Sequence, residues 1–141
     1  MEEVKKENKV KQELSERKKY KLKKYAEKYK SHEKLIIAST TRKTIRYIER
    51  NISNLPNKYM ILKNKIIKSC YSILENVYRA NIFQDINDKK EIIVNINMLN
   101  FYLEEALRKD LISHKKFESY VKHLIEIDKM TRSWFLYEKS R

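Results

Sequence analysis

Positive charge gathers within residues 40–69, TTRKTIRYIERNISNLPNKYMILKNKIIKS, which hold eight lysines and arginines and a single acidic residue. Such side chains can contact phosphate groups, and neutralising phosphates favours binding because it releases condensed counterions. Arg42, Arg46 and Arg50 follow one another at four-residue spacing, and Lys43 lies beside the same row. Like charges at this spacing repel each other on a helix. The row therefore indicates a surface on which contact with a polyanion offsets that repulsion.

The same charge continues beyond the proline at position 56. Lys58, Lys63, Lys65 and Lys68 extend it onto the next helical segment. We predict that these residues, together with the row before the proline, contact the phosphate backbone of RNA or DNA. The chain has neither a zinc-finger pattern nor an aromatic RNA-recognition signature, so binding should be weakly specific and sensitive to salt.

The net charge of the chain also favours nucleic acid as the partner. The formal net charge is +14 and the pI is near 9.7, and a charge of this size bears on partners rather than on fold. Three alternatives to nucleic acid stay open. They are a basic surface that only keeps the protein hydrated, an acidic protein partner, and an anionic membrane surface.

Catalytic or metal chemistry is not predicted. The chain has no glycine, which removes the phosphate-cradling loops of nucleotide enzymes and the nucleophile elbow of hydrolases. Cys70 lies on an apolar helical stripe and is expected in the core, where a thiol behaves as a small hydrophobe. Glu104 and Glu105 are adjacent, so on a helix they diverge instead of converging on one substrate. The three histidines lie on separate segments without the paired Glu-x-x-His pattern of bundle metal sites, so we expect a non-enzymatic protein without catalytic residues, cofactor or metal.

The charged residues are predicted to lie on helices. With no glycine and one proline, the chain lacks the residues that tight turns between strands favour. Pro56 should end the first helical segment. Ser113 should cap the last segment, and Asp85 or Asp88 the one before it. Apolar residues recur at three- or four-residue spacing over four segments, 33–52, 57–83, 88–109 and 114–138.

Each segment has an apolar stripe that is predicted to form the core. The stripes are Ile37, Ile45, Ile48 and Ile52; Tyr59, Leu62, Ile66, Cys70, Ile73, Val77 and Ala80; Ile92, Ile96, Leu99, Leu103 and Ala106; and Phe117, Val121, Leu124, Ile127, Thr131 and Trp134. Short connections between helices of this length place neighbours antiparallel. The predicted fold class is all-α, with an antiparallel up-down four-helix bundle over residues 33–141.

Residues 1–32 are predicted to form a separate basic arm that is helical or partly disordered. The thin stripe through Leu22, Tyr25 and Tyr29 is too sparse to stabilise an isolated helix well. Such a segment can order on a partner. Tyr20, Tyr25 and Tyr29 alternate with lysines and are candidates for base stacking, and a plain solvated extension accounts for the arm equally well.

The expected partners do not include a membrane, which stays only as the alternative named above. No segment approaches about 18 consecutive apolar residues, the length that suggests a membrane span. The start, MEEVKKENK, lacks the apolar stretch of a signal peptide. We therefore expect a cytoplasmic protein.

Four stretches carry a resemblance to a known family. They are NLPNKYMILKNKI and ILENVYRANI at the two ends of the second helical segment, LEEALRKDLIS, and FESYVKHLIEIDKMTRSW. Their order over residues 35–136 resembles the four-helix-bundle family that includes the accessory variability determinant (Avd) proteins of diversity-generating retroelements. The same family includes proteins encoded in intervening sequences of bacterial 23S ribosomal RNA genes.

The resemblance implies a homopentameric barrel with a basic surface that binds a reverse transcriptase and nucleic acid in support of mutagenic cDNA synthesis. The nucleic acid would be template RNA, cDNA or a hybrid. Arg79 and Arg132 stand where relatives often have basic residues, which implies that both contact nucleic acid. Two alternatives stay open, an rRNA-associated member of the family and a basic module that docks an acidic protein. The family's core positions correspond to Pro56, Tyr59, Ala80, Arg108 and Trp134.

Overall fold

The structure is a computed structural model that describes the backbone of residues 2–32 and 36–139. Side chains are described over residues 3–13, 15–21 and 36–135. All regular structure in these ranges is helical, which confirms the all-α prediction. The chain divides into two compact units, Met1–Leu35 and Ile36–Arg141, and each is described by itself.

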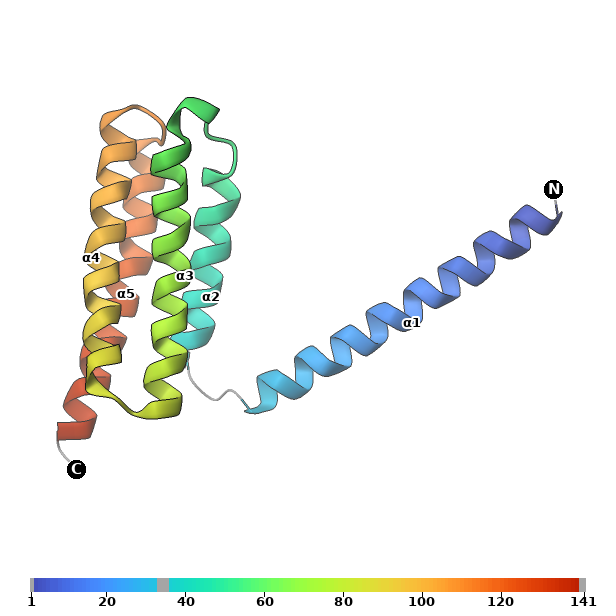
Figure 1. Ribbon diagram of the computed structural model, residues 1–141, viewed down its shortest axis with the longest axis horizontal. Helices are drawn as coiled ribbons and strands as arrows, with labels where there is room; N and C mark the ends of the chain where they lie inside the picture. Colours follow the sequence, from blue (N-terminus) through green and yellow to red (C-terminus); the bar gives the residue numbers. More distant parts are fainter. Residues whose placement is uncertain (1, 33–35, 140–141) are drawn as a thin grey trace. The chain divides into compact units, whose positions relative to one another are not determined.

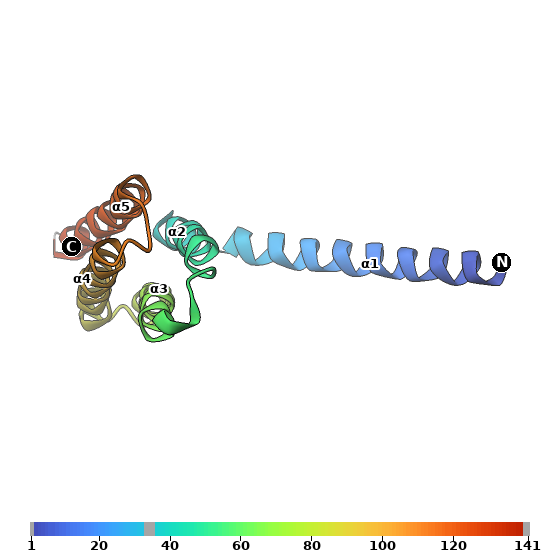
Figure 2. The same ribbon diagram turned by 90° about the horizontal axis from the view of Figure 1, so that it is seen from above.

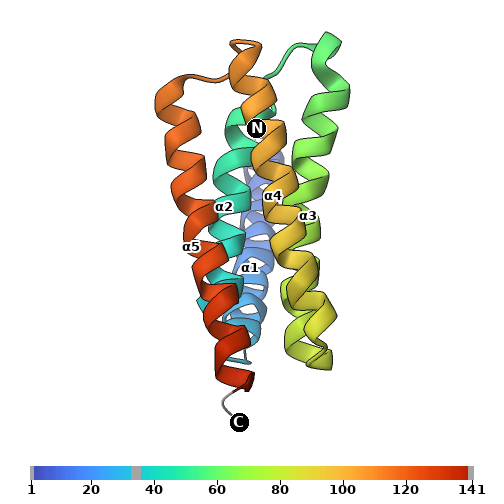
Figure 3. The same ribbon diagram turned by 90° about the vertical axis from the view of Figure 1, so that its left-hand side faces the viewer.

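The second unit is a bundle of helices joined by short connections (Figure 1). Helix α2 packs against α3 and α5, and helix α4 packs against the same two. Figure 2, which looks along the helices, shows this closed arrangement, and Figure 3 shows α4 between α3 and α5. The elements are α2 (Ile36–Ile52), the short 3₁₀ helix η1 (Asn57–Tyr59), α3 (Met60–Phe83), α4 (Ile86–Arg108) and α5 (His114–Lys139).

The core of the bundle follows the predicted stripes closely. All the residues predicted inward on α2 and α4 are buried. On α3 the stripe is buried from Ile66 to Ala80, whereas Tyr59 and Leu62 at its start are half-buried. On α5 the predicted residues Leu124, Ile127 and Thr131 are buried, but near its start Tyr120 is fully buried while Phe117 and Val121 are half-buried. Lys89 on α4 was not predicted to belong to the core, but its side chain is fully buried.

Lys89 is accommodated by aromatic residues near the end of α5. Its ammonium nitrogen lies 4.4 Å from the ring centroid of Trp134 and 5.9 Å from that of Phe135. The negative face of an aromatic ring attracts a cation, and the aliphatic stem of lysine packs like an apolar side chain. This contact joins the start of α4 to the last turns of α5, where Trp134 was predicted to lie on the apolar stripe.

The ends of the helices follow local rules. Helix α2 ends at Ile52, four residues before Pro56, as predicted. Gln84 closes α3 in the left-handed conformation with φ 54°, and its N–H donates to the carbonyl of Ala80. Of the two predicted caps for α4, Asp85 is the N-cap and Asp88 lies in the first turn, so α4 begins two residues earlier than predicted. Ser113 caps α5 as predicted, because its hydroxyl accepts from the N–H of Lys116 at 3.2 Å.

We expect Asp85→Ala to destabilise the bundle by about 1 kcal/mol, the usual cost of losing an N-cap. The carboxylate of Asp85 accepts a hydrogen bond from the N–H of Asn87 at 2.9 Å, and alanine cannot replace this acceptor. Urea unfolding followed by circular dichroism measures the change. Asp85→Asn keeps a capping acceptor and should retain most of the stability. Equal losses in the two variants would contradict a capping role.

The first unit contains helix α1 (Glu2–His32). Its sequence has no glycine or proline and pairs Glu7 with Lys11, and Glu13 with Arg17, at four-residue spacing. Pairs in this orientation support a solvated helix. The helical alternative predicted for the basic arm is therefore the conformation in the structure, and the predicted boundary after residue 32 adjoins residues 33–35, which lie outside the described part.

Candidate nucleic-acid interface

The outer surface of α2 carries three cationic side chains, Lys43, Arg46 and Arg50, which we call the α2 basic face. All three are exposed, whereas Ile45 and Ile48 on the opposite side of the helix are buried. Residues three, four and seven positions apart lie on one side of a helix. The three charges therefore form one row that is open to solvent.

Arg42, which was predicted in the same row, is turned toward α3. It is half-buried, and its Nη1 donates to the hydroxyl of Tyr78 at 2.7 Å. Glu49, the one acidic residue of α2, lies on the same side of the helix as Arg42. Its carboxylate accepts a hydrogen bond from the hydroxyl of Tyr71 on α3 at 2.8 Å. This hydrogen bond raises the pKa of Tyr71, since it stabilises the protonated phenol. The acid is thus held at the α2–α3 contact and does not belong to the α2 basic face.

The predicted lysines of η1 and α3 separate into three groups. Lys63 donates to the carbonyl of Ser53 at 3.0 Å and so ties α3 to the turn after α2. Lys68 is exposed on the outer side of α3. Lys58 and Lys65 are also exposed, but they border a groove between α3 and α4. The lysines therefore do not form a single patch with the α2 basic face.

Arg79 and Arg132 each lie beside a carboxylate of the bundle. Arg79 Nε lies 3.4 Å from Asp88 Oδ1 across the α3–α4 turn, and Arg132 Nε lies 2.9 Å from Asp128 Oδ2 on α5. Both arginine side chains remain more than half exposed, at 52% and 60%. Exposed pairs of this kind are weak, so both guanidinium groups can exchange a carboxylate for a phosphate. The structure places neither of them in the row on α2.

The groove between the start of α3 and the end of α4 was not predicted, and we call it the α3–α4 groove. It is open to solvent and has a volume of about 390 Å³. Its apolar lining consists of Tyr59, Ile61, Leu62, Phe101 and Tyr102. Its charged rim consists of Lys58, Lys65, Glu105 and Lys109. The signal in the sequence was the adjacent pair Phe101-Tyr102, neither of which belongs to the predicted apolar stripe of this helix.

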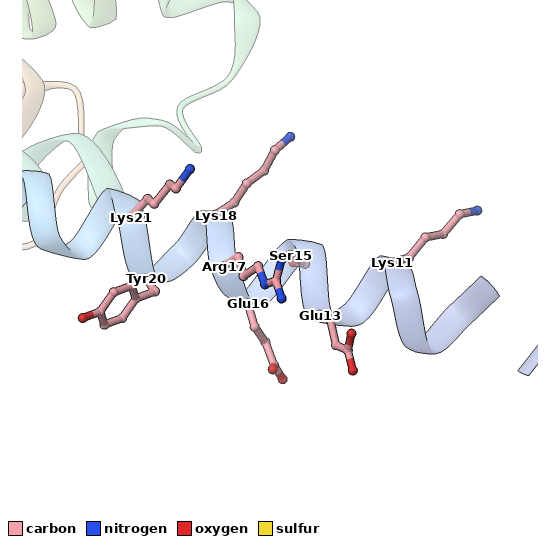
Figure 4. Close-up of a pocket in the computed structure, with 8 residues that line it drawn as sticks. All are labelled: Lys11, Glu13, Ser15, Glu16, Arg17, Lys18, Tyr20 and Lys21. Carbon is pink, nitrogen blue, oxygen red and sulfur yellow. The ribbon is translucent and has the colours of Figure 1, made fainter. Parts of the chain in front are cut away.

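Helix α1 presents charge along its length, as Figure 4 shows for residues 11–21. The side chains of Lys11, Lys18 and Lys21 project from one side of the ribbon, and those of Glu16 and Tyr20 from the other. All the described residues that line the hollow in this figure come from α1 itself. A surface of one helix offers charge to a partner but no enclosed site. The side chains of Tyr25 and Tyr29, the other predicted stacking residues, lie outside the described part.

The candidate nucleophile of the chain is buried in the bundle. Cys70 is 1% exposed, and burial raises the pKa of its thiol to about 12. The reactive form of cysteine is the thiolate, which is scarce at neutral pH when the pKa is this high. Cys70 therefore packs as a core residue, as predicted.

Carboxylates and other ligating groups are dispersed over the described residues. Glu105 accepts from Arg108 of its own helix and from the C-cap residue Lys109, at 3.0 and 3.3 Å. Glu104 accepts from Asn100 at 3.1 Å. Among the described side chains, those of residues 3–13, 15–21 and 36–135, no three histidine, cysteine or acidic groups gather closely enough to hold a metal ion. No helix within residues 2–32 and 36–139 is both long and apolar enough to cross a membrane.

Comparison with known proteins adds no identification. The chain matches no protein-family model and no curated protein. Its function is therefore argued from the charge, the exposure and the contacts described above.

Proposed function

We propose that this protein is a non-enzymatic nucleic-acid-binding protein that contacts the phosphate backbone through the α2 basic face. The observation that carries the proposal is the row Lys43, Arg46 and Arg50, exposed on one side of a helix whose only acid is engaged elsewhere. Three neighbouring cations without a neutralising carboxylate in the row create a local positive potential. Lys68 on α3 and the two exposed arginines outside the row add to the charge available to a long polyanion.

The finer assignment follows the family resemblance of the sequence. In this proposal the bundle is an antiparallel up-down four-helix bundle that assembles into a homopentameric barrel. The barrel serves as an accessory protein of a reverse transcriptase of the diversity-generating retroelement type. A ring of five subunits would repeat the α2 basic face, and repeated weak contacts on one strand multiply the affinity of each.

Two alternatives use the same surface. An rRNA-associated bundle protein would bind structured RNA without a polymerase. A protein-interaction module would instead bring the α2 basic face against an acidic protein. Salt weakens both kinds of contact, so direct binding to purified nucleic acid is the measurement that separates the last alternative from the others.

We expect the affinity for a structured RNA to fall by at least about 40-fold between 50 and 200 mM salt, because the three residues of the α2 basic face each neutralise one phosphate and the other exposed cations add to them. Fluorescence anisotropy measures the affinity, and light scattering in the same buffers measures the mass of the protein with and without RNA. A mass near five chains that gains RNA at low salt supports the full proposal. A protein that binds neither RNA nor DNA at low salt refutes it and leaves the acidic partner.

A further inference from the structure

The α3–α4 groove combines an exposed aromatic ring, Phe101, and two half-buried tyrosines with cations, which the α2 basic face does not. Phe101 is 50% exposed and Ile61 is 79% exposed, so apolar surface lies open between the two helices. The rings of Phe101 and Tyr102 lie 5.8 Å apart between centroids and are inclined at 60°. Because they are tilted, neither ring covers the flat face of the other.

The rim of the groove is cationic. Lys58, Lys65 and Lys109 are exposed on it. Glu105, the one acid of the rim, accepts hydrogen bonds from Arg108 and Lys109. The groove is therefore lined both by apolar side chains and by positive charge. A ligand that matches both has planar groups along a chain of anions, which describes a single-stranded nucleic acid.

The groove is also connected to the surface of the proposed function. Lys65, Lys68 and Tyr71 are three residues apart along α3, and each lies beside the next on the helix. Lys65 borders the groove, and Tyr71 bonds Glu49 on α2. This row thus leads from the groove across α3 toward α2, which bears the α2 basic face.

From these observations we infer that the α3–α4 groove binds unpaired bases of a single-stranded nucleic acid, with Phe101 as the stacking platform and the rim lysines on the flanking phosphates. The inference rests on the proposed function and names its substrate class. A second copy of this chain is the alternative occupant of the groove, and the mass measured by light scattering in the test below distinguishes it. An acidic peptide matches the charge but does not require exposed aromatic faces.

The test compares two labelled oligonucleotides of about twelve nucleotides, within the range of lengths that such sites cover. One is oligothymidylate and the other is an abasic strand with the same number of phosphates. We expect the wild-type protein to bind oligothymidylate about tenfold more tightly than the abasic strand, because stacking adds to the phosphate contacts. Phe101→Leu keeps an apolar side chain but removes the aromatic face, so it should abolish this difference while the affinity for the abasic strand stays.

A matched control is Met98→Leu, one turn away on the exposed side of α4, which should leave both affinities unchanged. The inference is overturned if Phe101→Leu still binds oligothymidylate more tightly than the abasic strand, or if the variant loses affinity for both strands equally. A change of mass in light scattering with Phe101→Leu would assign the groove to contact between subunits and overturn it as well. The inference is also overturned if Phe101→Leu weakens the binding of a labelled glutamate-rich peptide and leaves the binding of both oligonucleotides unchanged.

The two proposals fail in different ways in this experiment. A wild-type protein that binds neither strand refutes the groove inference, and the proposed function is refuted with it if the structured RNA of the salt series is not bound either. A wild-type protein that binds both strands equally refutes the groove inference alone, because its phosphate contacts then remain.

Discussion

Reversing the charge of the α2 basic face, in Lys43→Glu, Arg46→Glu and Arg50→Glu together, is expected to weaken binding to RNA or DNA by at least about 100-fold at low salt. Each side chain now exposed as a cation would become an anion beside the phosphates, so three contacts are lost and repulsion replaces them. The slope of log affinity against log salt should fall by about three, one for each phosphate contact removed. Fluorescence anisotropy over a salt series measures both quantities.

The control for this variant has the same change in net charge at another place. Lys115, Lys122 and Lys129 are exposed and lie seven residues apart along α5. Their joint reversal to glutamate tests whether the overall charge of +14, and not one surface, determines binding. An equal loss of affinity in the two triple variants would contradict the proposed site.

Retention of the fold can be verified for both triple variants by circular dichroism. The substituted side chains are exposed, so no core contact is removed. Arg50 is the basic residue in the last turn of α2, where a cation is favoured by the helix dipole. A glutamate there costs stability of about 1 kcal/mol or less, and Arg50→Gln in place of the glutamate reduces that cost.

The core could be predicted from the sequence because burial on a helix repeats at a fixed spacing. The stripe from Ile92 to Ala106 on α4 is buried at each predicted position. Lys89 continues that stripe one turn earlier, but it was not predicted to be buried because its side chain is charged. Its burial depends on Trp134, which lies 45 residues later in the sequence and comes close only in the folded bundle.

The candidate site could be predicted only in part, since periodicity places a residue on a side of its helix but does not say what faces it. Arg42 and Arg46 are four residues apart, yet Arg42 contacts Tyr78 on α3 whereas Arg46 is exposed. The ion pair of Arg132 with Asp128 was visible as a four-residue spacing. The α3–α4 groove required the two helices to be placed side by side, which sequence spacing does not provide.

Tyr120, like Lys89, carries a polar group that is buried in the bundle. Its side chain is fully buried, and its ring packs edge-on against Tyr47 at 5.2 Å between centroids. Burial, and next the neighbouring Tyr47, raise the pKa of Tyr120 from 10.0 to about 12. In the unfolded chain the phenol ionises near its ordinary pKa of about 10.

We therefore expect the free energy of unfolding to decrease as the pH rises from 10 to 12. Over this range the unfolded state releases the proton of Tyr120 while the folded state retains it, so each pH unit favours unfolding by up to about 1.4 kcal/mol. The contribution is fully present below pH 10, and about 3 kcal/mol has been lost by the pH at which the folded state also ionises. Cys70 adds to the loss from pH 9 upward, since its thiol pKa is likewise raised from 9.0 to about 12.

Tyr120→Phe separates the two contributions, because it keeps the ring against Tyr47 and removes the ionisable hydroxyl. Urea unfolding followed by far-UV circular dichroism should show a stability that falls less steeply between pH 10 and 12 than in the wild-type protein. Tyr20→Phe is the matched control, since Tyr20 is 68% exposed on α1 and its removal leaves Tyr120 in place. If Tyr120→Phe and the wild-type protein lose stability in parallel over this range, Tyr120 has the same pKa in the folded and unfolded states. Burial then does not raise the pKa of Tyr120.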